Sequence, residues 1–162
     1  MDVLESVATD LKAAFGRYPT GVAIITASGP HGPVGLTASS VASVSMTPPA
    51  LSFSVMGTPT ARVIGTAPSF VVHLLSSKHV ALAQEFAHPD GRRFTPEQGW
   101  RTLPSGEPFL PDALAVLRGV PLHRVPVGDS TLIVAAVREV LHGPDDGRLI
   151  YHRRQFVMTD GI

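Results

Sequence analysis

Short β-type segments, separated by turns that contain glycine and proline, recur along most of this chain. Alternating or β-branched apolar residues predict strands over residues 22–26, 34–44, 51–55, 69–75, 119–125, 131–141 and 148–152. The sequence Ser-Gly-Pro-His-Gly-Pro at residues 28–33 predicts a hairpin turn between the first two strands, and Gly-Pro-Asp-Asp-Gly at residues 143–147 predicts another between the last two. Many short strands at this spacing are typical of a β-barrel.

Helical segments are fewer than strands. An amphipathic helix near the N-terminus is predicted by four apolar residues at helical spacing: Leu4, Val7, Leu11 and Phe15. Residues 60–66 predict a helical turn, and a further helix is expected to run to residue 87 with Ser76 or Ser77 as its cap. Residues 88–112 are rich in proline, glycine and charge, which predicts a long functional or covering loop.

Composition excludes several kinds of function. The 162 residues carry 13 lysines and arginines against 13 aspartates and glutamates, so the chain lacks the positive charge that general nucleic-acid binding requires. The absence of cysteine excludes disulfides, cysteine metal ligands and cysteine nucleophiles, and a redox role would therefore need a bound cofactor. The histidines do not fall at metal-ligand spacing, so no metal site is expected.

One domain over residues 1–162 is expected, because the sequence contains no internal repeat, linker or low-complexity segment. The first ten residues are acidic and lack an apolar run, so neither a secretory signal nor a transit peptide is expected. The longest apolar stretches fall far below the roughly 20 residues of a membrane-spanning helix. We therefore expect a cytoplasmic protein that does not contact membranes.

Small side chains dominate one predicted strand. Residues 35–45 read Gly-Leu-Thr-Ala-Ser-Ser-Val-Ala-Ser-Val-Ser, where a barrel strand would normally carry larger β-formers. Small side chains leave the backbone exposed, so a flat aromatic ligand could lie against this strand and bind its N–H and hydroxyl groups. A tight contact within the sheet would explain the same residues, and the pattern leaves both interpretations open.

Several motifs occur together in the order and spacing of a known family. They are Phe15-Gly-Arg-Tyr-Pro-Thr-Gly-Val22, Gly35-Leu-Thr-Ala-Ser-Ser40, Ser45-Met-Thr-Pro-Pro49, residues 70–76, Leu82-Ala-Gln-Glu-Phe-Ala87, Arg93-Phe94, Gly128-Asp129 and Tyr151-His-Arg153. The chain resembles, over roughly residues 11–157, the flavin reductase-like, FMN-binding split-barrel proteins, and in particular the small reductase component of two-component flavin-dependent monooxygenases. The resemblance implies a mainly β fold: a six-stranded split barrel with flanking helices that forms a homodimer, with flavin at the subunit interface.

The resemblance also implies which residues bind the cofactor, FMN or FAD. The residues from 36 to 43 match the segment that flanks the isoalloxazine ring, those from 54 to 60 match the segment that leads toward the phosphate, and Arg93 could add positive charge there. The implied cofactor-binding residues are Leu36, Thr37, Ala38, Ser39, Ser40, Ala42, Ser43, Ser54, Val55, Thr58, Thr60 and Arg93.

A second group of residues matches the region where the family receives NADH or NADPH. These residues are Ser130, Tyr151, His152, Arg153 and Arg154. Ser130 departs from the family pattern, which has histidine there, and this change puts the affinity and preference for the dinucleotide in doubt. Arg92 departs as well, because an acidic residue commonly precedes the Arg-Phe pair.

The function implied by the resemblance is an NAD(P)H-dependent flavin reductase, an oxidoreductase that supplies reduced FMN or FAD to a partner monooxygenase. Hydride transfer from nicotinamide to flavin N5 needs orientation of the two rings rather than a general acid or base, so no catalytic side chain is assigned. Two alternatives are a flavin-binding electron-transfer module that has lost the donor site at Ser130, and a split-barrel oxidase that acts on a substrate such as pyridoxine phosphate. The oxidase would need a cluster of basic residues, which the scattered arginines do not establish.

Overall fold

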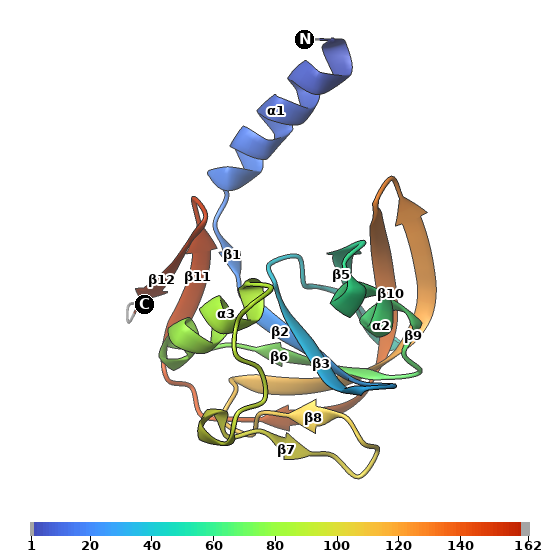
Figure 1. Ribbon diagram of the computed structural model, residues 1–162, viewed down its shortest axis with the longest axis vertical. Coiled ribbons are helices and arrows are strands. Elements are labelled where there is room, and N and C mark those ends of the chain that lie inside the picture. The colour runs from blue at the N-terminus through green and yellow to red at the C-terminus, as the bar shows by residue number, and fades with distance from the viewer. Residues whose placement is uncertain (1, 160–162) are drawn as a thin grey trace.

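The computed structural model describes residues 2–159 and is mainly β (Figure 1), so residues 1 and 160–162 of the expected domain lie outside the described residues. Its helices are α1 (Val3–Gly16), α2 (Pro59–Thr66) and α3 (Val80–Ala87), with 3-10 turns at Ser77–His79 and Pro96–Gln98. Its strands are β1 (Thr20–Gly21), β2 (Ala23–Gly29), β3 (Gly32–Ala38), β4 (Ala42–Met46), β5 (Pro49–Met56), β6 (Phe70–Leu74), β7 (Arg101–Thr102), β8 (Pro108–Phe109), β9 (Ala115–Val127), β10 (Ser130–His142), β11 (Arg148–His152) and β12 (Gln155–Thr159).

The main sheet closes on itself through a three-residue link. Its strand order is β3-β2-β6-β9-β10-β5-β4, so its two edge strands, β3 and β4, follow one another in sequence and are joined by residues 39–41. The sheet must therefore curl until its edges meet. At this seam the Ser40 hydroxyl donates to the Ser54 carbonyl at 3.2 Å and accepts from the Ser54 N–H at 3.0 Å.

This closure corrects two expectations from the sequence. Residues 34–44 do not form one strand, because the chain leaves β2 after Ala38 and pairs with β5 from Ala42 onward. The main sheet consequently has seven strands within the described residues, where six were expected. The predicted hairpin of β2 and β3 is confirmed, with Gly29 opposite Gly32 at its turn.

The barrel interior is filled by apolar side chains from the alternating positions of these strands. Phe53 on β5 and Phe70 on β6 are fully buried and pack edge to face, with ring centroids 5.1 Å apart. Ile25, Ile133 and the α2 residue Ile64 belong to the same buried cluster. Helix α2 thus closes one end of the barrel with its apolar side, while its N-terminal end stays at the surface.

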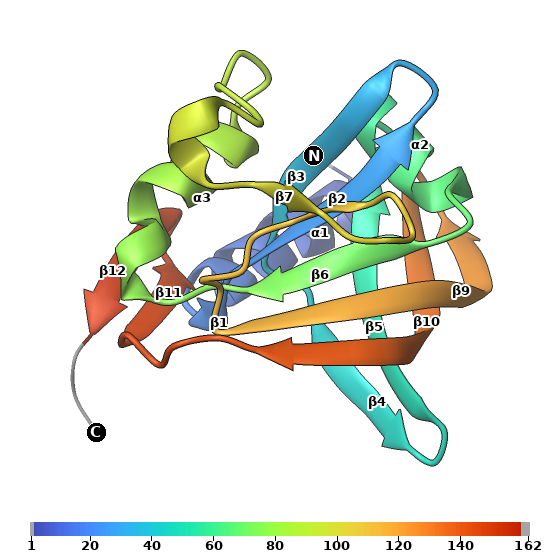
Figure 2. The ribbon, with the colours of Figure 1, turned by 90° about the horizontal axis from the view of Figure 1, so that it is seen from below.

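Residues 88–112 cover the barrel, as the sequence predicted, and Figure 2 shows the segment that carries β7 and β8 crossing β2 and β6. The buried His73 of β6 fixes this cover. Its Nδ1–H donates to the Ile24 carbonyl (3.0 Å), and its Nε2 accepts the Leu110 N–H (3.1 Å). Trp100 packs edge to face on the imidazole at 5.3 Å. Burial lowers the pKa of His73 to about 4, against a smaller opposing effect of the Ile24 hydrogen bond.

The turn predicted at residues 143–147 does not form a hairpin. Strand β10 pairs with β9 and β5, whereas β11 pairs with β1 and β12 in a separate three-stranded sheet. Gly143 explains the change of direction: its N–H donates to the Leu114 carbonyl, and a Cβ there would lie 1.8 Å from the Ala113 oxygen. Residues 143–147 therefore lead the chain out of the barrel and into the second sheet.

Helix α1 has the predicted amphipathic sequence but buries none of its residues. Asp2 and Glu5 form a capping box at its start. Its apolar stripe, including Leu4, Leu11 and Phe15, stays 56–80% exposed, and Figure 1 shows the helix projecting from the barrel. Within residues 2–159, no helix combines the length and apolar character needed to cross a membrane.

Candidate active site

A cavity of about 780 Å³ opens beside the seam of the barrel. It lies among β3, the end of β5, the start of α2, the end of α3 and the second sheet. Ten of the residues expected to bind flavin line it: Leu36, Thr37, Ala38, Ser39, Ser40, Ser54, Val55, Thr58, Thr60 and Arg93. Ala42 lines a second cavity instead, and Ser43 lines neither of the two.

The small residues of β3 and of the link that follows it divide into those that make hydrogen bonds within the protein and those that face the cavity without a partner. Thr37 Oγ1 donates to the Ala83 carbonyl of α3 at 2.7 Å, and Ser40 is bonded to Ser54 across the seam. Ser39, in contrast, is exposed and its hydroxyl has no hydrogen-bond partner within residues 2–159. Ala38 and Ser39 therefore present a low wall of small side chains on which a flat ring can lie.

The N-terminal end of α2 forms the opposite wall. Thr58 caps this helix, its Oγ1 accepting the Ala61 N–H at 3.2 Å, and Pro59 occupies the first helical position. The Thr58 hydroxyl keeps its own proton for a further bond, and the Thr60 N–H has no partner within the helix because it lies in the first turn. Hydroxyl donors and a free N–H at a helix N-terminus suit a phosphate group. This wall fits the phosphate of a flavin nucleotide.

Arg93 borders the cavity, but its guanidinium is directed at the protein backbone. Its Nε donates to the Gly35 carbonyl (2.9 Å), one terminal nitrogen donates to His88 and Gly91, and the other donates to Phe86 at 3.0 Å. These bonds join β3 to the C-terminal end of α3 and to the loop after it. Four of the five N–H groups are used in this way, so Arg93 positions the cavity wall and retains one donor for a ligand.

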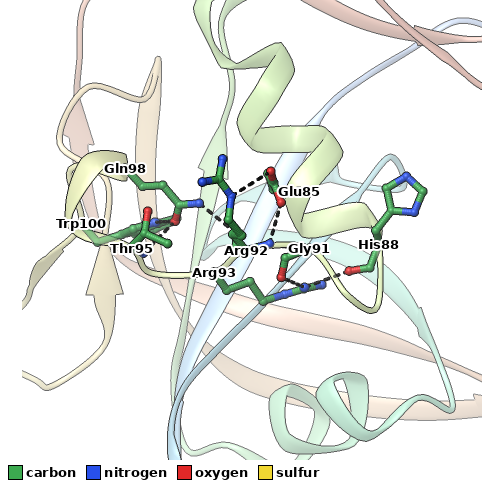
Figure 3. Close-up of polar contacts among 8 residues, drawn as sticks. All are labelled: Glu85, His88, Gly91, Arg92, Arg93, Thr95, Gln98 and Trp100. Atoms are coloured by element: carbon green, nitrogen blue, oxygen red, sulfur yellow. Dashed lines mark hydrogen bonds and ion pairs between the residues drawn. The ribbon is translucent and has the colours of Figure 1, made fainter.

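Figure 3 shows how the loop after α3 is held. The Glu85 carboxylate accepts the Arg92 N–H at 2.5 Å and the Arg92 Nε at 3.3 Å. The hydrogen bond from the Arg92 backbone, helped by the guanidinium, holds the pKa of Glu85 below its usual value. The Gln98 amide donates to the Arg92 carbonyl, and its oxygen accepts the Trp100 indole N–H. Arg92, the departure from the family pattern, thus forms an ion pair with Glu85.

The second cavity, of about 690 Å³, adjoins the first and shares Ser39, Ser40 and Tyr151 with it. Arg153 and Arg154 also line this second cavity, so three of the five residues expected to bind nicotinamide meet there. The lining residues of both cavities within the described chain include arginine but no aspartate or glutamate. An anionic ligand therefore meets no acidic side chain in either cavity.

The remaining two nicotinamide-site candidates lie elsewhere. His152 lines neither cavity. Ser130 pairs with Met56 at the start of β10, and Figures 1 and 2 place this end of the β9–β10 hairpin across the barrel from β11. Within one chain, the structure does not bring Ser130 together with Tyr151.

Some lining residues were missed by sequence reasoning. They include Met56, Pro59, Phe86, Pro89 and Phe156. Phe86 belongs to the predicted apolar side of α3, and nothing in its spacing separates a cavity wall from the core. Phe156 lies on β12, which was not predicted because its hairpin turn consists of Arg153 and Arg154. Their positive φ angles of 51° and 62° are those of a tight hairpin turn that Asn-Gly would normally signal.

A curled barrel with adjoining ligand-sized cavities at its seam defines a small-molecule-binding class of β protein. The chain matches the family model of the flavin reductase like domain over residues 15–160, and it belongs to this family, which confirms the resemblance seen in the sequence. No group of three or more potential metal ligands occurs within residues 2–159.

Named relatives and solved structures agree with this membership. The chain is 38% identical over 154 residues to the NADH:FMN oxidoreductase of Rhodococcus erythropolis, covering 92% of this chain and 80% of that protein. The crystal structure of a flavin reductase domain protein from Arthrobacter sp. FB24 superposes with a TM-score of 0.88 at 29% identity, covering 96% and 97% of the two chains. The bacterial protein BorF, the flavin reductase component of a two-component tryptophan halogenase, gives a TM-score of 0.84 at 25% identity, with 96% and 99% covered.

Proposed function

We propose that this protein is an NAD(P)H-dependent flavin reductase, an oxidoreductase that reduces FMN or FAD. The observation that carries the proposal is the pair of adjoining cavities, one with a small-residue wall and a helix N-terminus and the other with two arginines. Two reactants that exchange a hydride must lie in contact, and two cavities that share Tyr151 allow this. The 38% identity to an NADH:FMN oxidoreductase supports the same function.

The residues of this chain act by binding and orientation. We assign Ala38 and Ser39 to the flavin ring and Thr58 and Thr60 to the phosphate end. When bound, flavin accepts a hydride, one hydrogen with two electrons, from the reduced nicotinamide. The Ser39 side chain limits how closely the ring approaches the β3 backbone, whose N–H groups can stabilise negative charge on the flavin. We place the nicotinamide nucleotide near Tyr151, Arg153 and Arg154.

Anaerobic bleaching of oxidised flavin tests the proposal. A catalytic amount of the protein, mixed with FMN or FAD and an excess of NADH or NADPH, should bleach the flavin absorbance far faster than the same mixture without protein. A matched pair of variants locates the site. Ser39→Leu should abolish most of the rate and weaken flavin binding at least tenfold, because the larger side chain fills the ring space. Ser28→Leu, at an exposed position of β2 that lines neither cavity, should leave both unchanged.

Other outcomes identify the alternatives. Tight flavin binding without bleaching would favour an electron-transfer module. Product formation from pyridoxine phosphate in air, without nicotinamide, would favour an oxidase. Undiminished flavin affinity in Ser39→Leu would contradict the assignment of the β3 wall.

We further propose that the reduced flavin passes to a separate flavin-dependent monooxygenase. BorF, the reductase component of a two-component tryptophan halogenase, supports the transfer of reduced flavin to a second enzyme. The cavity is open at the surface, as release of a flavin to another enzyme requires. We also propose a cytoplasmic location, since that is where NADH and NADPH are available to a reductase of this kind.

We also propose that two copies of this chain form a homodimer. Val125 on β9 lies opposite Leu132 on β10, and Leu132 lies opposite Ser54, which lines the first cavity. Val125 and Leu132 remain 44% and 39% exposed, so an apolar row leads across the outer face of the barrel to the cavity. Exposed apolar rows of this kind are typical of an interface, and a second copy packed here would lie beside the first cavity.

Sedimentation tests the dimer. The wild-type chain should sediment at twice its 17.1 kDa, and Leu132→Glu should shift it toward the monomer because the interface would then bury an unpaired charge. Ser28→Glu, on β2, which pairs with neither β9 nor β10, should not change the mass. A wild-type chain that sediments as a monomer at micromolar concentration would contradict the proposal.

A further inference from the structure

Helix α1 carries an apolar stripe that is left uncovered within residues 2–159. Leu4, Val7, Leu11 and Phe15 lie on one side of the helix, and each side chain is more than half exposed. The helix has a complete N-terminal capping box, yet an isolated helix of 14 residues is only marginally stable in water. An exposed stripe of this kind is typical of a helix that packs against another surface.

The C-terminal end of α1 is held against the second sheet, which fixes the direction in which the helix leaves the barrel. The Arg153 N–H donates to the Gly16 carbonyl at 2.9 Å, and the N–H groups of Arg17 and Tyr18 donate to the last turn of the helix. The Phe15 and Tyr18 rings pack edge to face, with centroids 6.2 Å apart. Figure 1 shows the helix projecting away from this anchored end. A surface that covers the stripe therefore belongs to another molecule.

The outer face of the barrel carries an uncharged surface on β5, β10 and β9. Opposed residues of antiparallel strands share a face. Three successive rows lie on this face, namely Met56, Ser130 and Val127; Ser54, Leu132 and Val125; and Ser52, Val134 and His123. These nine residues, here called the outer patch, include no aspartate, glutamate, lysine or arginine. Met56, Val125, Val127 and Leu132 are 39–65% exposed, so the outer patch is open to an apolar partner.

The stripe and the outer patch have similar dimensions. The rise from Leu4 to Phe15 is about 16 Å along a helix. Three rows, each two residues from the next, extend about 14 Å along the strands, and three strands span about 10 Å, which is the width of one helix. A helix seated on the outer patch would bury apolar side chains on both surfaces and would desolvate no charged group of the patch.

A second copy of this chain can bring the outer patch to the stripe. A stable interface buries about 800 Å² on each side, and two side chains such as Val125 and Leu132 cannot supply this area alone. In a two-fold dimer the stripe of each copy meets the outer patch of the other, so every contact occurs twice. The two projecting helices then add the buried area that the row of Val125 and Leu132 lacks.

We infer that α1 is an arm exchanged between two copies: the apolar stripe of each copy packs on the outer patch of the other. The inference rests on the proposed homodimer and names the surfaces that form it. It also connects the dimer to the site, because Ser54 and Met56 belong to the outer patch and line the first cavity. The helix of one copy thus lies beside the proposed flavin cavity of the other.

Cross-linking tests which surfaces meet. The chain contains no cysteine, so one introduced cysteine is the only thiol of each copy. Leu11→Cys and an affinity-tagged Leu132→Cys, produced together and treated with a short bismaleimide, should give mainly the mixed pair. Cross-linking of Leu11→Cys only to itself would show that two helices pack together. Cross-linking of Leu132→Cys only to itself would show that two outer patches meet, and either result overturns the inference.

A charge on the stripe should dissociate the dimer. Leu11→Glu should raise the dimer dissociation constant about 100-fold or more and shift the sedimenting mass toward 17.1 kDa, because the outer patch would bury an unpaired carboxylate. Thr9→Glu introduces the same charge on the opposite side of α1 and should leave the mass unchanged. No residue of α1 is buried in one copy, so both variants should keep the β-sheet signal in circular dichroism.

Amide hydrogen exchange gives an independent measurement. Exchange within α1 should be slow in the wild-type dimer and fast in Leu11→Glu, because the helix is only marginally stable once its stripe is uncovered. Exchange within the buried strand β6 should stay slow in both. Fast exchange of α1 in the wild-type dimer would overturn the inference.

The outcomes separate this inference from the proposals on which it rests. A wild-type dimer whose mass is unchanged by Leu11→Glu would overturn the exchanged arm and leave the homodimer standing. A wild-type monomer would overturn both. Anaerobic bleaching of flavin by NADH in the same preparations tests the reductase function separately.

Discussion

Replacing Arg93 by methionine is expected to lower the free energy of unfolding by about 2–4 kcal/mol and to weaken flavin binding at least tenfold. The substitution keeps most of the apolar stem but removes the donors to the Gly35, Phe86, His88 and Gly91 carbonyls. It also removes the guanidinium that stacks 5.3 Å from the Phe86 ring centre. Because β3 and the end of α3 both line the cavity, loss of their connection should change stability and affinity together. Urea denaturation and flavin titration measure the two effects.

The neighbouring arginine supplies the control. Arg92→Met removes a side chain that is 76% exposed and forms an ion pair with Glu85, so the free energy of unfolding should change by about 0.5 kcal/mol or less. The backbone N–H of residue 92 would still donate to Glu85. A different result for Arg93→Met, with normal stability but lost flavin binding, would mean that Arg93 acts directly on the ligand and not through the wall.

Acidification from pH 6.5 to pH 4 is expected to remove about 3 kcal/mol of stability through His73 alone. The folded state holds its pKa at about 4, chiefly through burial, while the unfolded chain takes up a proton near pH 6.5. Protons therefore bind the unfolded state first, and stability falls as the pH drops through this window. Protonation in the folded state would also remove the acceptor for the Leu110 N–H and loosen the cover.

The variant His73→Gln tests this origin. Its amide can donate to the Ile24 carbonyl and accept from Leu110, and it does not titrate. The variant should be less stable at pH 8 because of imperfect fit, yet its stability should fall less steeply between pH 6.5 and 4. His79, whose pKa is also lowered by burial, contributes in the same direction, so His73→Gln should flatten only part of the slope. An unchanged slope would contradict a buried, neutral His73.

The sequence patterns located most elements because each strand carries its own local alternation. Residues 51–55 and 131–141 alternate as barrel strands must, and their pairing in the structure follows. Pairing partners were harder to predict. The turn at residues 143–147 has hairpin chemistry, but Gly143 is required there for close approach to Ala113, a contact between segments thirty residues apart. Local propensity carries no information on such a contact.

In the candidate site, too, local patterns predicted some features, while features that depend on distant contacts could not be predicted. The small residues at 35–45 left a ligand wall and a tight contact within the sheet both open, and in the structure Ser39 lines the cavity. Residue type alone could not separate Ser39 from Ser40, whose hydroxyl forms two hydrogen bonds with Ser54 across the seam of the barrel. Nor could it predict that the Arg93 guanidinium would donate to four backbone carbonyls. These roles depend on which segments meet in three dimensions.

The link at residues 39–41 has a consequence for how the protein folds. Its two flanking strands are the outermost in a seven-stranded sheet and are tethered to each other from the start, so the wall of the barrel is complete only when the strands between them have paired. Pairings of high sequence separation, such as β6 with β9 and β5 with β10, must therefore precede the cavity. Flavin then binds only the completed barrel, and a concentration one hundred times its Kd would add about 2.7 kcal/mol to the native state. The fraction of molecules that bind flavin therefore reports the fraction in which the barrel is complete.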